Sequence, residues 1–140
     1  MSVANVALAK DFNAEIGRLL DYRESTLGTS TESKVMRRKL DMAGRTMPFA
    51  VFELWVKEVG PYAEAIKNKN DTVFDLPEVK ENSMFQAAGV VSCWHQFTQE
   101  QKEHIWSLLQ RIMGKAAAVM RRREVPNALS VGANLLGSLF

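Results

Sequence analysis

Three side chains in the second half of the sequence could bind a metal ion or act in nucleophilic catalysis: Cys93, His95 and His104. A zinc site usually takes four ligands, supplied by paired cysteines or histidines at short spacing. This chain offers one Cys-x-His pair and one further histidine, and residues two apart on a helix do not face each other. We therefore expect no metal centre and no catalytic dyad here, and we interpret Cys93 as a buried, inert thiol.

The other patterns that could carry chemistry are weak. Paired carboxylates, such as Glu53 with Glu58 and Glu100 with Glu103, lie among lysines, which is typical of solvent-exposed helix faces. No glycine-rich phosphate loop is present, since Gly89 stands alone. The sequence therefore predicts a protein that is not an enzyme and uses no cofactor.

The composition is that of an ordinary folded domain. The 140 residues, 46% hydrophobic and 24% charged, suit one domain and exclude a collagen-like, disulfide-scaffold or wholly disordered chain. A single cysteine excludes an internal disulfide. No apolar run reaches the roughly 20 residues that cross a bilayer, and the first residues lack the layout of a signal peptide. We expect an intracellular protein in a reducing compartment such as the cytoplasm.

Apolar residues recur at helical spacing through most of the chain, which predicts an all-α fold, a compact bundle of about five helices. Helices 49–59 and 99–123 carry the most apolar faces and are expected at its centre, with a capping box at Thr98 and Gln101. In the first helix, charged residues such as Glu15 lie mostly away from the apolar stripe. The expected helices lie over about residues 3–22, 32–43, 48–59, 62–67 and 99–123. The stretch 78–97 could be helix or contain a short strand, and we favour helix.

Two connecting regions have their own character. Residues 25–31 combine hydroxyl side chains with a glycine and are expected to form a flexible loop or a helix-capping region. The helix over 32–43 is expected to be peripheral, because four basic residues leave few side chains to bury. The candidates for burial there are Val35, Met36, Leu40, and Met42 or Ala43.

Residues 1–126 are expected to form the single helical domain, followed by an apolar tail over 127–140. The tail is too short to span a membrane, yet it has more apolar residues than an idle terminus needs. It either docks on its own domain or inserts into a groove of a partner protein. The candidate partner-binding residues are Leu129, Leu135, Leu136, Leu139 and Phe140.

The net charge of +2 is the sum of stretches of opposite charge along the chain. Residues 1–50 sum to about +2, residues 51–103 to about −4 and residues 104–140 to about +4. Two basic clusters could contact nucleic-acid phosphates if the fold brought them together, but no aromatic stacking platform accompanies them. We favour solvated helix faces, and keep nucleic-acid binding as the alternative, through Arg37, Arg38, Lys39, Arg121, Arg122 and Arg123.

About half of the chain also carries a family-like pattern. An aromatic-rich helix from Phe49 leads to Pro61-Tyr62 and an asparagine- and aspartate-rich turn, and later Trp94 precedes an Ile-Trp-x-Leu-Leu helix start. This resembles small helical proteins of unknown function from large DNA viruses of algae and protists, although Ser107 stands where that family tends to carry a larger residue. The resemblance implies a viral origin, an all-helical fold and packing roles for Trp55, Trp94, Trp106 and Leu109. It implies no catalytic residue.

Taken together, these features predict a non-enzymatic protein–protein interaction or assembly protein. We expect a protein partner or a homo-oligomer, formed through helical faces and the apolar tail.

Overall fold

A computed structural model describes residues 3–122 and 130–140 of the chain. Within these ranges every regular element is a helix, which confirms the all-α fold class. The expected number of about five helices is wrong: the described residues form nine α-helices and three short 3-10 helices. The α-helices are α1 (Val3–Leu27), α2 (Thr31–Arg45), α3 (Ala50–Glu58), α4 (Ala63–Lys67), α5 (Pro77–Lys80), α6 (Ser83–Ala88), α7 (Val90–Cys93), α8 (Gln99–Met120) and α9 (Ser130–Leu139); the 3-10 helices are η1 (Gly60–Tyr62), η2 (Asp71–Asp75) and η3 (Trp94–Gln96).

Local signals divide the middle of the chain into short helices. Pro77 occupies the start of α5, where the missing N–H is tolerated. The Asn82 side chain accepts hydrogen bonds from the first backbone amides of α6. Gly89 ends that helix in the left-handed conformation, with φ of 70°. The stretch 78–97, expected as one helix, is therefore a series of short ones.

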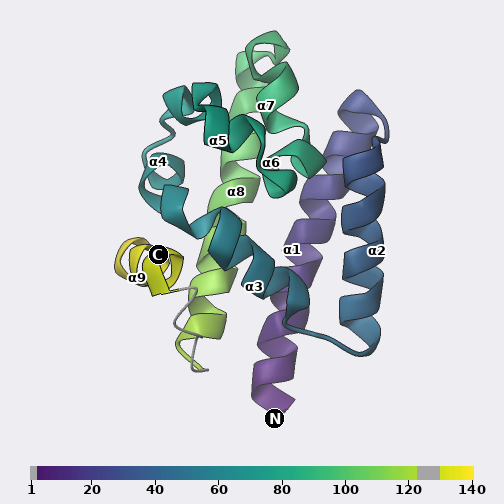
Figure 1. The fold of residues 1–140 in the computed structure, drawn as a ribbon, viewed down its shortest axis with the longest axis vertical. Helices are drawn as coiled ribbons and strands as arrows, with labels where there is room; N and C mark the ends of the chain where they lie inside the picture. The colour runs from purple at the N-terminus through teal and green to yellow at the C-terminus, as the bar shows by residue number, and fades with distance from the viewer. Residues whose placement is uncertain (1–2, 123–129) are drawn as a thin grey trace.

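The loop expected over residues 25–31 is shorter in the structure. Helix α1 continues to Leu27, and the Ser25 hydroxyl is satisfied inside it by donating a hydrogen bond to a carbonyl of the preceding turn, at 2.9 Å. Gly28 then takes φ of 79° and reverses the chain. Ser30 begins α2 through a capping box with the serine three positions on. A tight corner thus joins two helices that lie side by side (Figure 1).

The long helices α1 and α8 pack against each other, and α4 and α9 also contact α8 (Figure 1). We expected the 49–59 helix to be the main partner of α8, but that place belongs to α1. Helix α3 reaches α8 through the Trp55 side chain, whose indole N–H points at the Met113 sulfur, 3.3 Å away. The apolar stripes predicted for these helices are buried as expected; they consist of Phe49, Phe52, Trp55, Val56, Val59, Ile105, Leu108, Leu109, Ile112, Met113 and Ala116.

Aromatic rings fill the core beneath the short helices. Phe74 stacks on Trp106 with ring centroids 5.4 Å apart, and lies 4.7 Å from the ring of Trp94. The indole N–H of Trp94 donates to Asp71 at 3.1 Å, so its polar edge is satisfied. None of the helices in residues 3–122 and 130–140 is long and apolar enough to cross a membrane.

Candidate functional site

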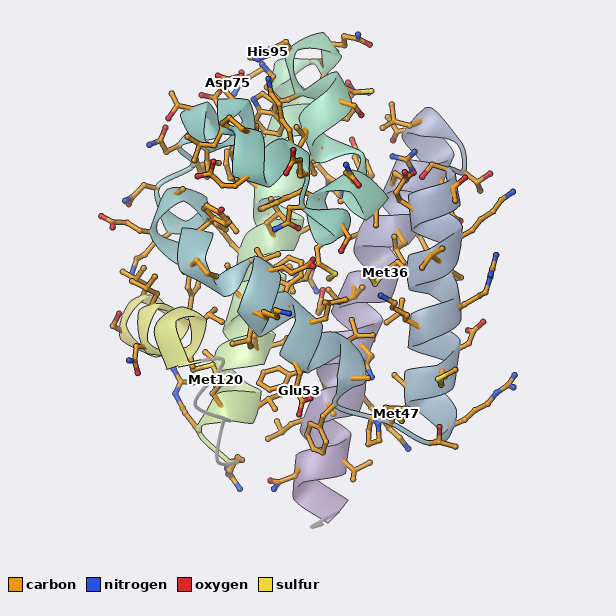
Figure 2. The ribbon with its side chains drawn as sticks, in the orientation of Figure 1. Met36, Met47, Glu53, Asp75, His95 and Met120 are labelled. Atoms are coloured by element: carbon orange, nitrogen blue, oxygen red, sulfur yellow. The ribbon has the colours of Figure 1, made fainter. Side chains whose placement is uncertain are left out.

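The three residues that could have supported metal or thiol chemistry lie in separate surroundings. Cys93 is half-buried rather than buried, next to the Ser92 hydroxyl. His95 is exposed, with Nε2 3.4 Å from Asp75 Oδ1, at one end of the molecule (Figure 2). His104 lies against the Tyr22 ring, with centroids 4.3 Å apart. In the described ranges, no group of three or more His, Cys, Asp or Glu side chains is placed to hold a metal ion.

The carboxylates that the sequence paired have different structural partners. Glu58 accepts a hydrogen bond from the Ser83 hydroxyl at 2.8 Å and one from the Met84 amide at 3.3 Å, so it ties α3 to the start of α6. Glu103 forms an ion pair of 2.7 Å with Lys69. The hydrogen bond from Lys69 lowers the pKa of the Glu103 carboxyl. Glu58 thus connects two helices, and Glu103 connects α8 to the turn after α4.

The apolar tail docks on its own domain in this structure. Helix α9 packs against α3, η1, α4 and α8, and Leu136 is fully buried there. Leu135, Leu139 and Phe140 are partly buried against the same core, whereas Leu129 lies outside the described residues. Of the two alternatives left open for the tail, the structure therefore shows the intramolecular one.

Two cationic side chains donate hydrogen bonds to carbonyls at the C-terminal end of α9. Lys67 Nζ donates to the Leu139 carbonyl at 2.8 Å, and Arg121 Nη2 donates to the Phe140 carbonyl at 2.9 Å. Because cations near a helix C-terminus complement its dipole, both contacts favour the docked position of α9.

The two basic clusters lie on different sides of the molecule. Helix α2, with Arg38 and Lys39 exposed, and the C-terminal end of α8, with Arg121 and Arg122 exposed, flank α1 on opposite sides (Figure 1). Arg123 falls outside the described residues. The clusters therefore do not form one continuous patch in the part of the chain that is described.

Arg37, the remaining member of the first cluster, is committed to contacts within the chain. Its Nη2 lies 2.8 Å from Asp21 and 3.2 Å from Glu24, which join α2 to α1. These pairs remove one cation from any phosphate-binding surface.

The outer side of α2 carries exposed apolar residues. Val35 is 39% exposed, Met42 57% and Met47, in the turn after the helix, 52%. Arg38 and Arg45 lie on the same side by helical spacing. A hollow of about 310 Å³ lies between them beside Met42, and Asp41 and Thr46 also line it. We call Val35, Arg38, Met42, Arg45 and Met47 the α2 face.

The exposure of the α2 face corrects part of the sequence prediction. Val35 and Met42 were candidates for burial, but Met36 and Ala43 take that role instead. Figure 2 shows Met36 on the inner side, between α1 and α2, and Met47 at the far end of the helix. Each residue turns about 100° around a helix, so neighbours such as Val35 and Met36 face different sides. Helix α2 buries Ser33, Met36 and Ala43, and Leu40 packs against the same core, so these four residues define its inner side.

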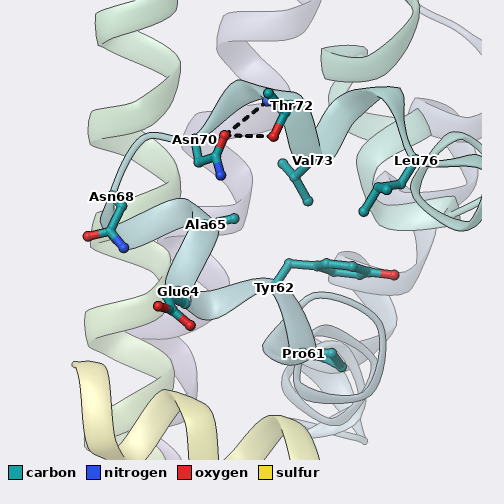
Figure 3. A pocket seen from close by; sticks show the side chains of 9 residues that line it. All are labelled: Pro61, Tyr62, Glu64, Ala65, Asn68, Asn70, Thr72, Val73 and Leu76. Carbon is teal, nitrogen blue, oxygen red and sulfur yellow. Dashed lines mark hydrogen bonds between the residues drawn. The ribbon is translucent and has the colours of Figure 1, made fainter.

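A second hollow lies on α4 and η2 (Figure 3). Its volume is about 360 Å³, and Tyr62, Glu64 and Leu76 are among the residues that line it. Val73 and Leu76 point toward the Tyr62 ring, while the Asn70 side chain accepts two hydrogen bonds from Thr72, at 2.7 Å and 3.3 Å, and shapes one wall. We call this hollow the α4 groove.

The α4 groove has an acidic rim. Leu76 is 39% exposed. With Val35, Met42 and Met47 it is one of four large apolar side chains that are exposed to solvent in the described part of the chain. Burial, and then the negative charge of Glu78, raise the pKa of the Tyr62 hydroxyl. Glu64 contributes a second carboxylate to the lining. An apolar floor with acidic edges suits an apolar, basic surface of a partner.

Comparison with family models, curated proteins and solved structures gives no match for this chain. The resemblance to helical proteins of large DNA viruses remains a prediction.

Sequence analysis did not identify the α2 face or the α4 groove. One signal was available: Val35 and Met42 are seven positions apart, so they lie on the same side of the helix, and each directly precedes a residue that the helix buries, Met36 and Ala43. Leu76 had no such signal, because it precedes Pro77 between two short helices.

Proposed function

We propose that this is a non-enzymatic assembly protein that associates with copies of itself, head to tail. The α2 face of one copy packs in the α4 groove of the next. The observation that carries the proposal is the placement of exposed apolar residues. In the described part of the chain, three of the four large ones lie on the α2 face, and the fourth, Leu76, lines the α4 groove. One contact would therefore cover all four.

Charge supports the pairing of unlike surfaces. Arg38 and Arg45 of the α2 face outnumber the one carboxylate beside them, Asp41, so two α2 faces brought together would carry net charge of the same sign and repel. Glu64 lines the α4 groove, and the charge of Glu78 acts on Tyr62 in it. A basic surface against an acidic one steers association and disfavours the symmetric alternative.

The positions of the two surfaces also suit this arrangement. Figure 1 places α2 and α4 at opposite edges of the molecule. A contact between two different surfaces leaves each copy with one free surface, so assembly continues until a ring closes or an open chain forms. We therefore expect a series of sizes that grows with concentration, rather than a discrete dimer.

Nucleic-acid binding through the basic clusters has less support. It needs a continuous cationic surface, whereas Arg37 is paired with two carboxylates and the clusters flank α1 on opposite sides. The tail contributes less to association than the sequence suggested, because Leu136 is engaged within its own domain.

Sedimentation velocity over a range of protein concentrations tests the proposal. We expect Met42→Glu and Leu76→Glu each to reduce the protein to monomer, because each replaces an apolar side chain at the centre of the contact with a charged group that the contact would have to remove from water. Ser107→Glu adds the same charge at an exposed position of α8 and should leave the distribution unchanged.

Mixing the two blocked variants makes the test specific for a head-to-tail contact. The Leu76→Glu copy keeps an intact α2 face, and the Met42→Glu copy keeps an intact α4 groove. An equimolar mixture should form a dimer and stop there. A wild-type protein that stays monomeric at every concentration, or a mixture that stays monomeric, would contradict the proposal.

A further inference from the structure

A cleft of about 620 Å³ lies where the end of α1 and the start of α2 meet α5, α6 and α7. It lies near the α1–α2 corner, with α6 beside both α1 and α2 (Figure 1). This size is within the range of small-molecule sites. Its lining is mostly polar and consists of Arg23, Ser30, Glu32, Lys80, Gln86, Val91 and Ser92.

Arg23 is the unusual member of the lining. Its Nε is buried and has no hydrogen-bond partner among the described residues, and no described carboxylate forms an ion pair with its guanidinium. A guanidinium partly removed from water without an acceptor costs free energy. An anion in the cleft would offset that cost.

Gly89 allows the guanidinium to take this position. The Arg23 Nη1 lies so close to Gly89 that a Cβ at Gly89 would collide with it. Gly89 also has φ of 70°, which L side chains rarely adopt. The glycine that ends α6 therefore also makes room for the cation at the cleft.

The remaining lining residues indicate the class of ligand. Lys80 is exposed and, like Arg23, forms no ion pair with a described residue, whereas Glu32 is the one acidic residue that lines the cleft. The two cations and the positive end of the α2 dipole favour a phosphate group. The Ser92 hydroxyl and the Glu32 carboxylate can bond the hydroxyl groups of a polar body. The Ser30 oxygen caps α2 and the Gln86 side chain donates to the Lys80 carbonyl, but the Ser30 O–H and the Gln86 amide oxygen are still available to it.

We propose that this cleft binds a phosphate monoester of a small polyhydroxylated molecule, such as a sugar phosphate. Arg23 and Lys80 hold the phosphate, and the polar side chains around them hold the hydroxylated part.

Isothermal titration calorimetry at physiological ionic strength tests this, with glucose 6-phosphate, inorganic phosphate and glucose as probes. We expect glucose 6-phosphate to bind about tenfold more tightly than inorganic phosphate, and glucose not to bind. Arg23→Met keeps the apolar stem and should weaken binding about tenfold or more, since hydrogen bonds to charged groups contribute that much. Lys80→Gln should weaken it severalfold.

Lys115→Gln is the matched control, because it removes one charge from an exposed position on α8. Its affinity should equal that of the wild type. Circular dichroism shows whether Arg23→Met folds. If it does not, two other measurements test the proposal: the affinity of Lys80→Gln, and the NMR signal of the Arg23 Nε–H in the wild-type protein. That signal should shift when glucose 6-phosphate is added. No binding by the wild type, equal affinity for the ester and inorganic phosphate, or equal weakening by Lys115→Gln would each overturn the proposal.

Discussion

Gly60 and Gly132 bring η1 and α9 into backbone contact. A Cβ built on Gly60 would lie 2.8 Å from the Cα of Gly132, which is closer than real Cβ atoms approach. A Cβ on Gly132 would collide with the Val56 carbonyl oxygen of α3. Two glycines about 70 positions apart in the sequence therefore set how closely the last helix docks.

Gly132→Ala should weaken this docking. The added methyl has to push α9 away from α3, and overpacking of this kind costs about 1–3 kcal/mol. Gly137→Ala in the same helix is the control, since a Cβ there would meet only the end of the Met120 side chain at an ordinary 3.7 Å. Both changes raise helix propensity equally, so the difference in the free energy of urea unfolding isolates the collision. Equal stabilities for the two variants would contradict the close contact.

Glu15 is a buried carboxylate, 2% exposed, between α1 and α8. Its Oε1 lies 2.7 Å from Arg18 and 3.2 Å from Arg111, while its Oε2 has no hydrogen-bond partner among the described residues. Arg111→Met removes one of the two cations and should cost about 1–2 kcal/mol, discounted because the arginines are half exposed. Lys115→Met, on the same helix, should stay within about 0.5 kcal/mol.

A double-mutant cycle on Glu15 and Arg111 checks that the effect belongs to the pair. Combining Glu15→Met with Arg111→Met should cost less than the sum of the two single changes, because the second change removes a group that has already lost its partner. Strict additivity in chemical denaturation would show that the two side chains do not interact.

The start of α8 gives a local prediction. Thr98 Oγ1 accepts from the Gln101 amide at 3.1 Å, and the Gln101 side chain accepts from the Thr98 amide at 2.8 Å. Thr98→Ala should lower the free energy of unfolding by about 1 kcal/mol, and Thr98→Ser should restore most of it. Thr29→Ala, in the exposed α1–α2 corner, should change stability little. A Thr98→Ala protein as stable as the wild type would contradict the cap.

This cap was predictable because its signal lies within four consecutive residues. The buried stripes of α3 and α8 were predictable because their signal also lies within a single segment: the helical period alone selects residues such as Trp55 and Ile112. Over 25–31 the cap alternative is correct at Ser30, but the loop was predicted too long: hydroxyl side chains do not exclude a helix, and Ser25 lies within α1 with its hydroxyl bonded to the preceding turn.

Features that depend on distant segments were not predictable. Glu15 lies among charged residues and was placed on the polar side of its helix, yet a cation 96 positions away allows it to be buried. The α4 groove depends on how short helices turn around Tyr62 and Leu76, and the phosphate cleft on five separate elements that meet at Arg23. The spacing of residues within one segment does not predict which distant segments contact each other in the fold.

The ion pair between Lys69 and Glu103 predicts a pH effect of defined sign. The hydrogen bond from Lys69 lowers the pKa of the Glu103 carboxyl in the folded protein. The contribution of the pair to stability is therefore present in full above the ordinary glutamate pKa of about 4.3, and it is lost as the pH falls through the lowered folded-state pKa. NMR titration of the Glu103 carboxyl should show the lowered pKa, and Lys69→Gln should raise that pKa toward the ordinary range.

Lys57→Gln removes the same charge at an exposed position of α3 and should leave the Glu103 pKa unchanged. High salt should act as Lys69→Gln does, because both groups are exposed and their attraction is screened; a Glu103 pKa indifferent to Lys69→Gln would show that the lysine does not hold it.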